Sequence, residues 1–218
     1  MVSIPSTYAN NDGARVAIAV PVRDTTSMLF TRSLANLMHK CGQDRKPISL
    51  HMNHGSNIVS QRQDLASEIL NNTRADYILW LDSDMHFPSD LLDNMLNRKC
   101  KIVGVPYATR TRPIRSTAFT SRFDYNARLN KPTTRNKLEK VAALGFGCVL
   151  IHRSVFESMD SPYFGLKWDP GSESVMGEDI YFFEKAANAE FDIYADFELA
   201  EKVAHVGNKA FTLEDIEE

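Results

Sequence analysis

The sequence predicts an α/β sandwich, in which a mostly parallel central sheet is covered by helices on both faces. Short apolar runs that suit buried strands alternate with amphipathic stretches from Val16 to Pro106. This alternation is typical of right-handed crossovers between parallel strands. The chain has 218 residues, of which 43% are hydrophobic and 24% charged, so we expect a single globular domain over 1–218 rather than a disordered chain.

The elements of the first half can be assigned in order. The predicted strands are short apolar runs bounded by polar residues, and they cover residues 16–22, 48–52, 77–81 and 101–105. The predicted helices carry apolar residues at helical spacing, and they cover residues 25–40, 57–71 and 91–97. Pro88 precedes the third helix, where proline suits the first turn. A parallel sheet binds ligands beyond the carboxyl ends of its strands, so we expect a ligand site just after Val22, Met52, Leu81 and Val105.

The pattern breaks over residues 108–140, which are polar and weakly periodic. This excursion carries nine Lys or Arg residues but only two acids, Asp124 and Glu139. It is either a solvated loop or hairpin, or a lid that meets an anionic ligand. In the second case, replacing Arg110, Arg112 and Arg115 with alanine should raise the apparent KM for the substrate that carries the negative charge.

Periodic apolar patterns resume over residues 141–210. A strand over 141–151 is interrupted by Gly145 and Gly147, which predicts a bulge or a close backbone approach. A short helix over 154–159, an aromatic loop that includes Trp168, a helix over 177–189 and an apolar segment over 203–207 follow. Trp168 either packs in the core or stacks on an acceptor sugar.

Charge and composition narrow the function classes. The 25 basic and 28 acidic residues give a net charge of −3, which argues against a general nucleic-acid binder. No apolar run approaches the roughly 20 residues that span a bilayer, and the N-terminus does not have the pattern of a secretory signal. The three cysteines match no zinc-binding spacing and favour a reducing, cytoplasmic setting.

The sharpest local signal is Asp82-Ser83-Asp84, which directly follows the predicted strand over 77–81. In extended backbone both carboxylates project the same way, and two such carboxylates repel unless a cation or proton intervenes. Oxygen ligands suit Mg²⁺ or Mn²⁺. The alternative is a capped turn, since Asp and Ser favour turns. His86 continues the alternation as a possible third ligand, or is a surface histidine.

Arg62 faces inward, because it lies at helical spacing from the apolar residues of its helix. A buried guanidinium needs an anionic partner. That partner is either a structural acid such as Asp64 or Glu68, or the aspartates and the phosphates of a nucleotide.

Two features of the second half also point to chemistry. Glu178 and Asp179 begin a predicted helix, where acids either favour the helix dipole or place a general base in a cleft. His205 lies on a short apolar segment, where a lone histidine is more often a core residue than a ligand.

Taken together, these motifs resemble the GT-A glycosyltransferases. The ordered set is a strand followed by Asp82-Ser83-Asp84, then Gly145-Phe146-Gly147, then Gly177-Glu178-Asp179, then a late His205. The resemblance extends over nearly the whole chain, and residues 77–96 in particular look like the small GT-A enzymes of large viruses and phages. It implies a GT-A type, Rossmann-like sandwich with a nucleotide-binding half over 14–107, the basic excursion over 108–140 and an acceptor and catalytic half over 141–210. For a viral member it also implies the host cytoplasm.

The resemblance also implies roles for individual residues. Asp82, Asp84 and His205 match the metal site, which holds Mn²⁺ or Mg²⁺ against the diphosphate of a nucleotide sugar, with a UDP-sugar expected. Asp179 matches the base of inverting members, with Glu178 as its substitute. The implied donor-binding residues are Pro21, Arg23, Asp24, Arg62, Ser83, Gly145 and Gly147. The acceptor is a glycan or another hydroxyl compound.

Two other functions remain open from the sequence. A sugar-phosphate nucleotidyltransferase also uses acidic metal ligands, but its phosphate loop is usually rich in glycine, whereas Arg23-Asp24-Thr25-Thr26 contains none. A module that binds a nucleotide sugar or glycan without turnover is the second alternative.

Overall fold

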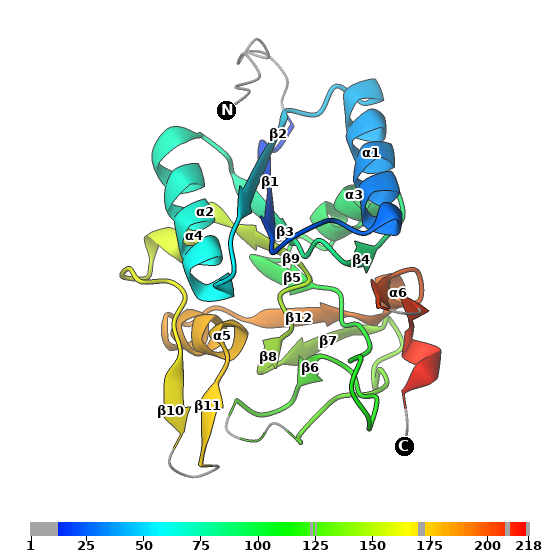
Figure 1. Ribbon diagram of the computed structural model, residues 1–218, viewed down its shortest axis with the longest axis vertical. Coiled ribbons are helices and arrows are strands. Elements are labelled where there is room, and N and C mark those ends of the chain that lie inside the picture. The colour runs from blue at the N-terminus through cyan, green and yellow to red at the C-terminus, as the bar shows by residue number, and fades with distance from the viewer. Residues whose placement is uncertain (1–12, 123, 125, 170–172, 208–209, 217–218) are drawn as a thin grey trace.

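A seven-stranded sheet with helices on both faces forms the centre of the molecule (Figure 1). The computed structural model describes residues 13–122, 124, 126–169, 173–207 and 210–216. Residues 1–12, which carry most of the segment tested for a signal, therefore lie outside the described residues. Within the described part of the chain, no helix combines the length and apolar character needed to cross a bilayer.

The central sheet has the strand order β2-β1-β3-β9-β5-β12-β7. Strands β2, β1, β3, β5 and β12 run in one direction, and β9 and β7 run in the other. The strands are β1 (Val16–Val22), β2 (Ile48–His54), β3 (Tyr77–Leu81), β5 (Ile102–Gly104), β7 (Leu138–Val141), β9 (Cys148–His152) and β12 (Ile193–Asp196). The predicted α/β class with a mostly parallel sheet is confirmed.

Two hydrophobic cores lie on opposite faces of this sheet because successive strand residues point to opposite sides. One core packs against α2 (Ile58–Asn72), α4 (Arg153–Glu157) and α5 (Glu178–Asn188). The other packs against α1 (Met28–Gln43), α3 (Leu91–Asn97) and α6 (Phe197–Ala200). Figure 1 shows α1 and α3 on one side of the sheet and α2 and α4 on the other. Helices on both faces are therefore confirmed.

Small sheets extend this framework. The strand β4 (Met85–His86) pairs with β13 (Ala204–Val206), which also pairs with β14 (Ala210–Phe211). A hairpin joins β10 (Lys167–Asp169) to β11 (Ser174–Met176), and β6 (Ala118–Phe119) pairs with β8 (Ala143–Leu144). A single 3₁₀ turn covers Leu213–Asp215.

The predicted strand over 141–151 is wrong in detail. The structure divides it among β7, β8 and β9, because the chain turns over residues 145–147 before it joins the central sheet. The basic excursion is also shorter than the predicted 108–140, since β7 begins at Leu138 and pairs with β12. Its middle contributes β6, which is buried against the sheet.

Candidate functional site

The candidate site lies where β3 ends. The Asp82 N–H donates to the Gly147 carbonyl at 3.0 Å, and the Met85 N–H donates to the Asp82 carbonyl at 3.1 Å. The chain therefore turns directly after the strand, beside the glycine segment that enters β9. The turn separates the two carboxylates: Asp82 faces Arg62, and Asp84 faces His205 and Arg110.

Arg62 lies in the second turn of α2, the helix that follows β2 and begins with an Asn57 cap. Its side chain is 4% exposed. One amino group donates to both Asp82 oxygens at 2.9 and 3.2 Å, and the other donates to Glu178 Oε1 at 2.5 Å. The guanidinium also lies 4.9 Å from the centre of the Phe146 ring.

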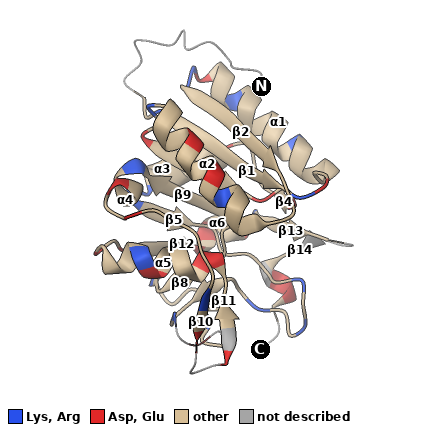
Figure 2. Ribbon diagram, turned by 60° about the vertical axis from the view of Figure 1, so that its left-hand side comes forward, with Lys and Arg blue, Asp and Glu red and all other residues tan. Residues whose placement is uncertain are grey.

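Arg62 faces inward, and among the anionic partners left open by the sequence it contacts Asp82 of the Asp-Ser-Asp motif. Figure 2 shows α2, with basic and acidic residues along it, against the sheet. The Arg62 Nε is buried without a hydrogen-bond partner among the described residues. Arg62 therefore ties the end of β3 to the start of α5 and is fixed by two carboxylates.

The second half of the site joins Asp84 to His205. Strand β13 pairs with β4, so His205 lies opposite Met85, and its Nε2 is 3.4 Å from Asp84 Oδ2. The His205 Nδ1 lies 3.1 Å from the Ala108 carbonyl. With a metal ion between the two side chains, a His205 that donates its Nδ1 proton to this carbonyl would present the Nε2 lone pair to the ion.

This arrangement fits a divalent metal with two protein ligands. A carboxylate and an oriented imidazole suit Mn²⁺ or Mg²⁺, which can take their remaining ligands from substrate phosphates and water. Asp82 does not join them, because both of its oxygens accept from Arg62. Among the described residues no group of three or more His, Cys, Asp or Glu side chains is placed to hold a metal. The role of Asp82 as a direct ligand stays a prediction.

The ionisation of Asp84 suits such a site. Burial opposes the charged form, but the hydrogen bond and charge of His205 and the nearby Arg110 guanidinium together hold the Asp84 pKa below its ordinary value. The Arg110 Nη1 lies 3.0 Å from Asp84 Oδ2 and donates to the Val206 carbonyl at 2.9 Å. Arg110 comes from the basic excursion, which therefore reaches the site.

Glu178 and Asp179 begin α5 beside Arg62. Glu178 pairs with Arg62, whereas the Asp179 carboxylate accepts from the Ile180 N–H at 2.7 Å. Burial raises the pKa of Asp179 to about 6, the charge of Glu178 acts in the same direction, and Arg62 opposes them. A carboxylate in this range is ionised at neutral pH and still accepts a proton readily.

The position of the Tyr107 side chain explains why residues 145 and 147 are glycines. A Cβ at Gly145 would lie 2.6 Å from the Tyr107 hydroxyl, and one at Gly147 would lie 2.8 Å from its ring. The Gly147 N–H donates to the buried Tyr107 hydroxyl at 3.2 Å. Burial keeps the Tyr107 pKa well above its usual value, so the phenol stays neutral. The predicted close approach is therefore made by a side chain of the protein, and contact of the glycines with a donor stays a prediction.

The loop after β1 is exposed at its tip. Arg23 and Asp24 form a weak ion pair at 3.5 Å in solvent, and Pro21 lies in β1 beside Asn53 of β2. The buried Gln61 amide donates to the carbonyls of Val22 and Asn53 at 2.7 and 3.2 Å, so it joins the ends of β1 and β2. Sequence reasoning missed Gln61, although it directly precedes Arg62.

The remaining candidates are placed as follows. The Ser83 carbonyl accepts from the Ser27 N–H at 3.1 Å, which fixes the motif against the start of α1. His86 Nδ1 lies 2.8 Å from Ser33 Oγ, so the structure places His86 against α1 rather than with the aspartates. Trp168 is 58% exposed, so it is not a core residue.

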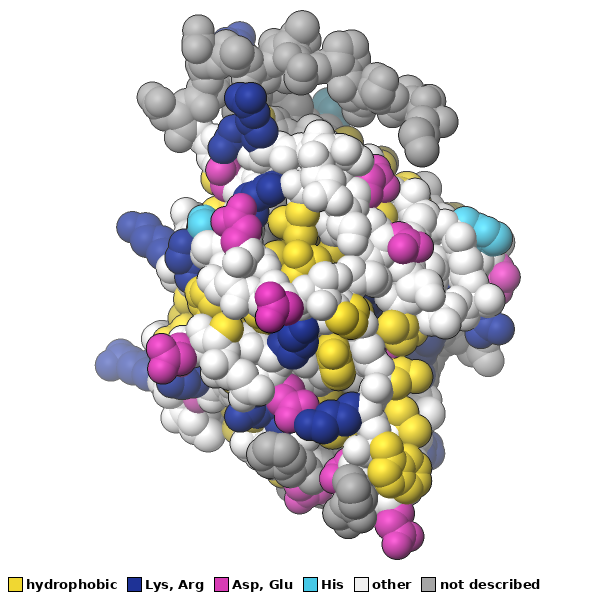
Figure 3. Space-filling view, turned by 90° about the vertical axis from the view of Figure 1, so that its left-hand side faces the viewer, with side chains coloured by type: hydrophobic (Ala, Val, Ile, Leu, Met, Phe, Trp, Pro, Cys, Tyr) yellow, Lys and Arg dark blue, Asp and Glu magenta, His cyan; other side chains and the backbone are white. Residues whose placement is uncertain are grey.

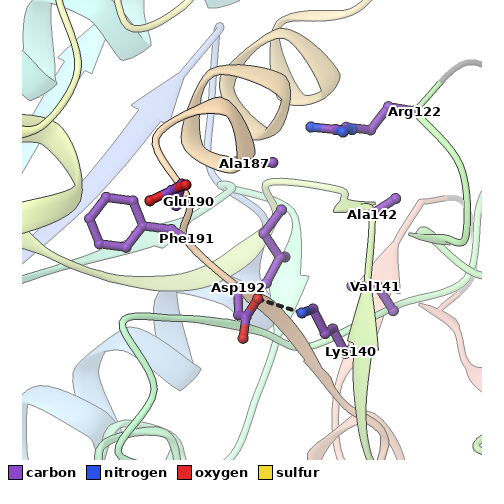
Figure 4. A pocket seen from close by; sticks show the side chains of 9 residues that line it. Arg122, Lys140, Val141, Ala142, Ala187, Glu190, Phe191 and Asp192 are labelled. Atoms are coloured by element: carbon purple, nitrogen blue, oxygen red, sulfur yellow. Dashed lines mark ion pairs between the residues drawn. The ribbon is translucent and has the colours of Figure 1, made fainter.

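A separate surface pocket of about 410 Å³ lies between the end of α5 and the strands β7 and β12 (Figure 4). The Lys140 ammonium and an Asp192 carboxylate form an ion pair at 2.6 Å on its wall. None of its lining residues belongs to the candidate site.

Comparison of this chain with known proteins shows a similarity of fold. No protein-family model matches the sequence, and no curated protein matches it significantly. The structure is similar to that of A197 from STIV, with a TM-score of 0.65 and 16% identity over 92% of this chain and 91% of that one. This likeness confirms the fold resemblance drawn from the sequence.

Weaker likenesses involve larger proteins. GalNAc-T7, crystallised with UDP, GalNAc and Mn²⁺, gives a TM-score of 0.48 and 9% identity, and TarS of S. aureus gives 0.46 and 12%. The matches cover 84% and 86% of this chain, but only 41% and 37% of those chains. With TM-scores below 0.5, they do not bear on the chemistry of this chain.

Proposed function

We propose that the chain is a metal-dependent glycosyltransferase that transfers a sugar from a nucleotide sugar to an acceptor hydroxyl with inversion. The observation that carries this proposal is the arrangement around Arg62, which joins Asp82 at the end of β3 to Glu178 at the start of α5. Asp84 lies two residues after Asp82, and Asp179 directly follows Glu178, which supports the proposal that the Asp84–His205 pair and the Asp179 carboxylate serve one site. The expected donor is a UDP-sugar.

Donor binding involves both ends of the site. Asp84 and His205 would hold Mn²⁺ or Mg²⁺, which neutralises charge on the departing diphosphate. Arg62, held between Asp82 and Glu178, is the positively charged group that we propose on the donor's phosphates. The loop with Pro21, Arg23 and Asp24 follows β1 and would meet the nucleoside. Ser83, Gly145 and Gly147 would border the phosphates and the sugar.

Transfer requires a proton acceptor. The acceptor oxygen forms a bond to the anomeric carbon, and the bond from that carbon to the diphosphate breaks with its electron pair leaving on the phosphate oxygen. The acceptor's proton passes to the Asp179 carboxylate, whose raised pKa suits this role. Attack from the face opposite the diphosphate inverts the anomeric centre. Glu178 is a poorer base here, because it is paired with Arg62.

Calorimetric titration tests the donor site. Nucleoside diphosphates are titrated into the wild type and Asp84→Ala, with and without Mn²⁺. We expect metal-dependent binding of UDP that the substitution abolishes. Absence of nucleotide binding under every metal condition contradicts the proposal. Once a donor is found, NMR of the product tests stereochemistry, and a retained anomeric configuration would rule out direct attack assisted by Asp179.

A further inference from the structure

Arg110 occupies the position on Asp84 where a cation is expected. Its Nη1 lies 3.0 Å from Asp84 Oδ2, the same oxygen that faces His205 Nε2 at 3.4 Å. A divalent ion held by Asp84 and His205 needs that oxygen, and a guanidinium beside the ion would be repelled. The ion and the present position of Arg110 therefore exclude each other.

The two arginines of the site differ in how firmly they are held. Arg62 is almost fully buried and is bonded to two carboxylates. The Arg110 side chain is 43% exposed, and an ion pair with this exposure contributes little to stability. Arg110 also lies in a short turn closed by Thr109 and Arg115, whose backbone N–H groups donate to the Arg115 carbonyl and the Thr109 hydroxyl. By leaving Asp84, Arg110 also gives up its hydrogen bond to the Val206 carbonyl, but this contact is exposed, so the core is not disturbed.

We propose that Arg110 is a donor-binding residue that occupies the cation position on Asp84 until metal and donor arrive. It then gives up Asp84 to the ion and pairs with the donor diphosphate. This inference rests on the proposed function. The diphosphate lies beside the ion in that proposal, and a guanidinium forms two parallel hydrogen bonds with phosphate oxygens. Arg110 therefore competes with the metal in the free protein and assists the nucleotide in the complex.

The inference predicts that Arg110→Ala strengthens the binding of Mn²⁺ and weakens the binding of UDP. Free Mn²⁺ is measured by electron paramagnetic resonance as Mn²⁺ is titrated into the wild type, Arg110→Ala and Arg115→Ala, without nucleotide. We expect Arg110→Ala to lower the Mn²⁺ dissociation constant about three- to fivefold, because the half-exposed pair it removes is weak. In saturating Mn²⁺, calorimetry should show UDP bound about three- to tenfold more weakly, because a charge-assisted contact is lost.

Arg115→Ala is the matched control. It removes the same charge from the same turn, but Arg115 Nη1 donates to Asn126 Oδ1 at 2.7 Å rather than to Asp84. Its Mn²⁺ affinity should stay at the wild-type value, so a gain shared by both variants overturns the proposal. Arg110→Lys keeps the charge and provides a second variant if the alanine variant does not fold.

Other outcomes separate the inference from the proposed function. If Arg110→Ala binds Mn²⁺ no more tightly than the wild type while Asp84→Ala loses Mn²⁺, the competition is wrong and the metal site stands. Tighter Mn²⁺ binding with unchanged UDP affinity overturns the contact with the diphosphate. If the wild type binds no Mn²⁺, even with UDP present, the metal site is wrong and the role of Arg110 falls with it.

Discussion

Asp179 combines burial with a neighbouring negative charge, and both raise its pKa to about 6. A base must be ionised to accept a proton, so we expect kcat/KM of the proposed transfer to rise with pH and level off above about 6. A pH–rate profile with the identified donor measures this acidic limb. Asp179→Asn should lower kcat about 10²- to 10⁴-fold, the usual contribution of a general base.

The pH–rate profile of the Glu178→Gln variant tests whether the acidic limb belongs to Asp179. It removes the charge that raises the Asp179 pKa and leaves Arg62 closer to unpaired, so the acidic limb should move to lower pH. A profile whose limb is unchanged in Glu178→Gln, or still present in Asp179→Asn, would assign the limb to another group.

The same raised pKa predicts a stability effect. The folded pKa of Asp179 is about 6 against an ordinary value of 3.8, so the folded state binds the proton more tightly. The stability from this group is therefore full below about pH 4 and is lost as the pH rises through 6. At 1.36 kcal/mol per pKa unit, the loss is up to about 3 kcal/mol.

Asp179→Asn cannot ionise, so it should be more stable than the wild type at pH 8. Urea unfolding of both proteins at pH 4 and pH 8 measures the difference. We expect a gap that grows with pH. A wild type that gains stability relative to the variant between these pH values would contradict the assignment.

Candidate residues could be selected from the sequence where they stood out against a recognisable strand or helix. Asp82 and Asp84 follow a strong apolar run, and Arg62 stands out as a charge on an apolar helix face. Arg110 and Tyr107 were not selected individually, because Arg110 is one of nine basic residues in the predicted excursion and Tyr107 has no pattern of its own. Only the pairing of β13 with β4 decides that His205 meets Asp84.

At the scale of elements, the β10–β11 hairpin presents an apolar face to solvent. Trp168 lies opposite Val175 in the hairpin, and Leu166 precedes Trp168 by two residues, so all three share one face. They are 58%, 53% and 60% exposed. Figure 3 shows hydrophobic side chains at the surface on this side of the molecule. The opposite face is anchored by buried Met176 and by Lys167, which pairs with Glu184 of α5.

This hairpin leads directly into α5 and Asp179, which favours the sugar-stacking alternative for Trp168. Trp168→Ala should raise the acceptor KM about three- to tenfold with the donor KM unchanged, the range expected for one aromatic contact. Steady-state kinetics with each substrate varied in turn measures both. Met28→Ala, which removes an exposed hydrophobic side chain from α1, is the control. Equal acceptor KM values in both variants would contradict stacking.

Strands could be predicted from the sequence where burial on both faces produces a continuous apolar run. Strands β1 and β3 are buried on both faces and read as continuous apolar runs. The β10–β11 hairpin was not predicted, because its strands have three residues each and its apolar face is exposed. The glycine segment looked like a single strand, because nothing local reveals that Tyr107 packs against the turn between β8 and β9.

At the scale of the whole molecule, the two predicted halves are interleaved. The sheet places β9 between β3 and β5, and β5 lies between β9 and β12. Both neighbours come from the second half of the chain. The largest core side chain of β3, Trp80, packs against Phe146 and Phe164, which also come from that half. Local patterns predict the class of such a fold, but strand order depends on contacts between distant residues.

This interleaving predicts that residues 1–107 do not fold alone. In the isolated fragment β5 has no strand beside it, Trp80 loses its aromatic partners and Arg62 loses Glu178. A buried guanidinium that has lost one of its two carboxylate partners and an exposed apolar sheet face both destabilise the fragment. We expect circular dichroism without a cooperative thermal transition, and its recovery on coexpression with residues 108–218. A cooperative transition in the fragment alone would mean that the first half carries a self-sufficient core, in which Asp82 alone is enough to pair Arg62.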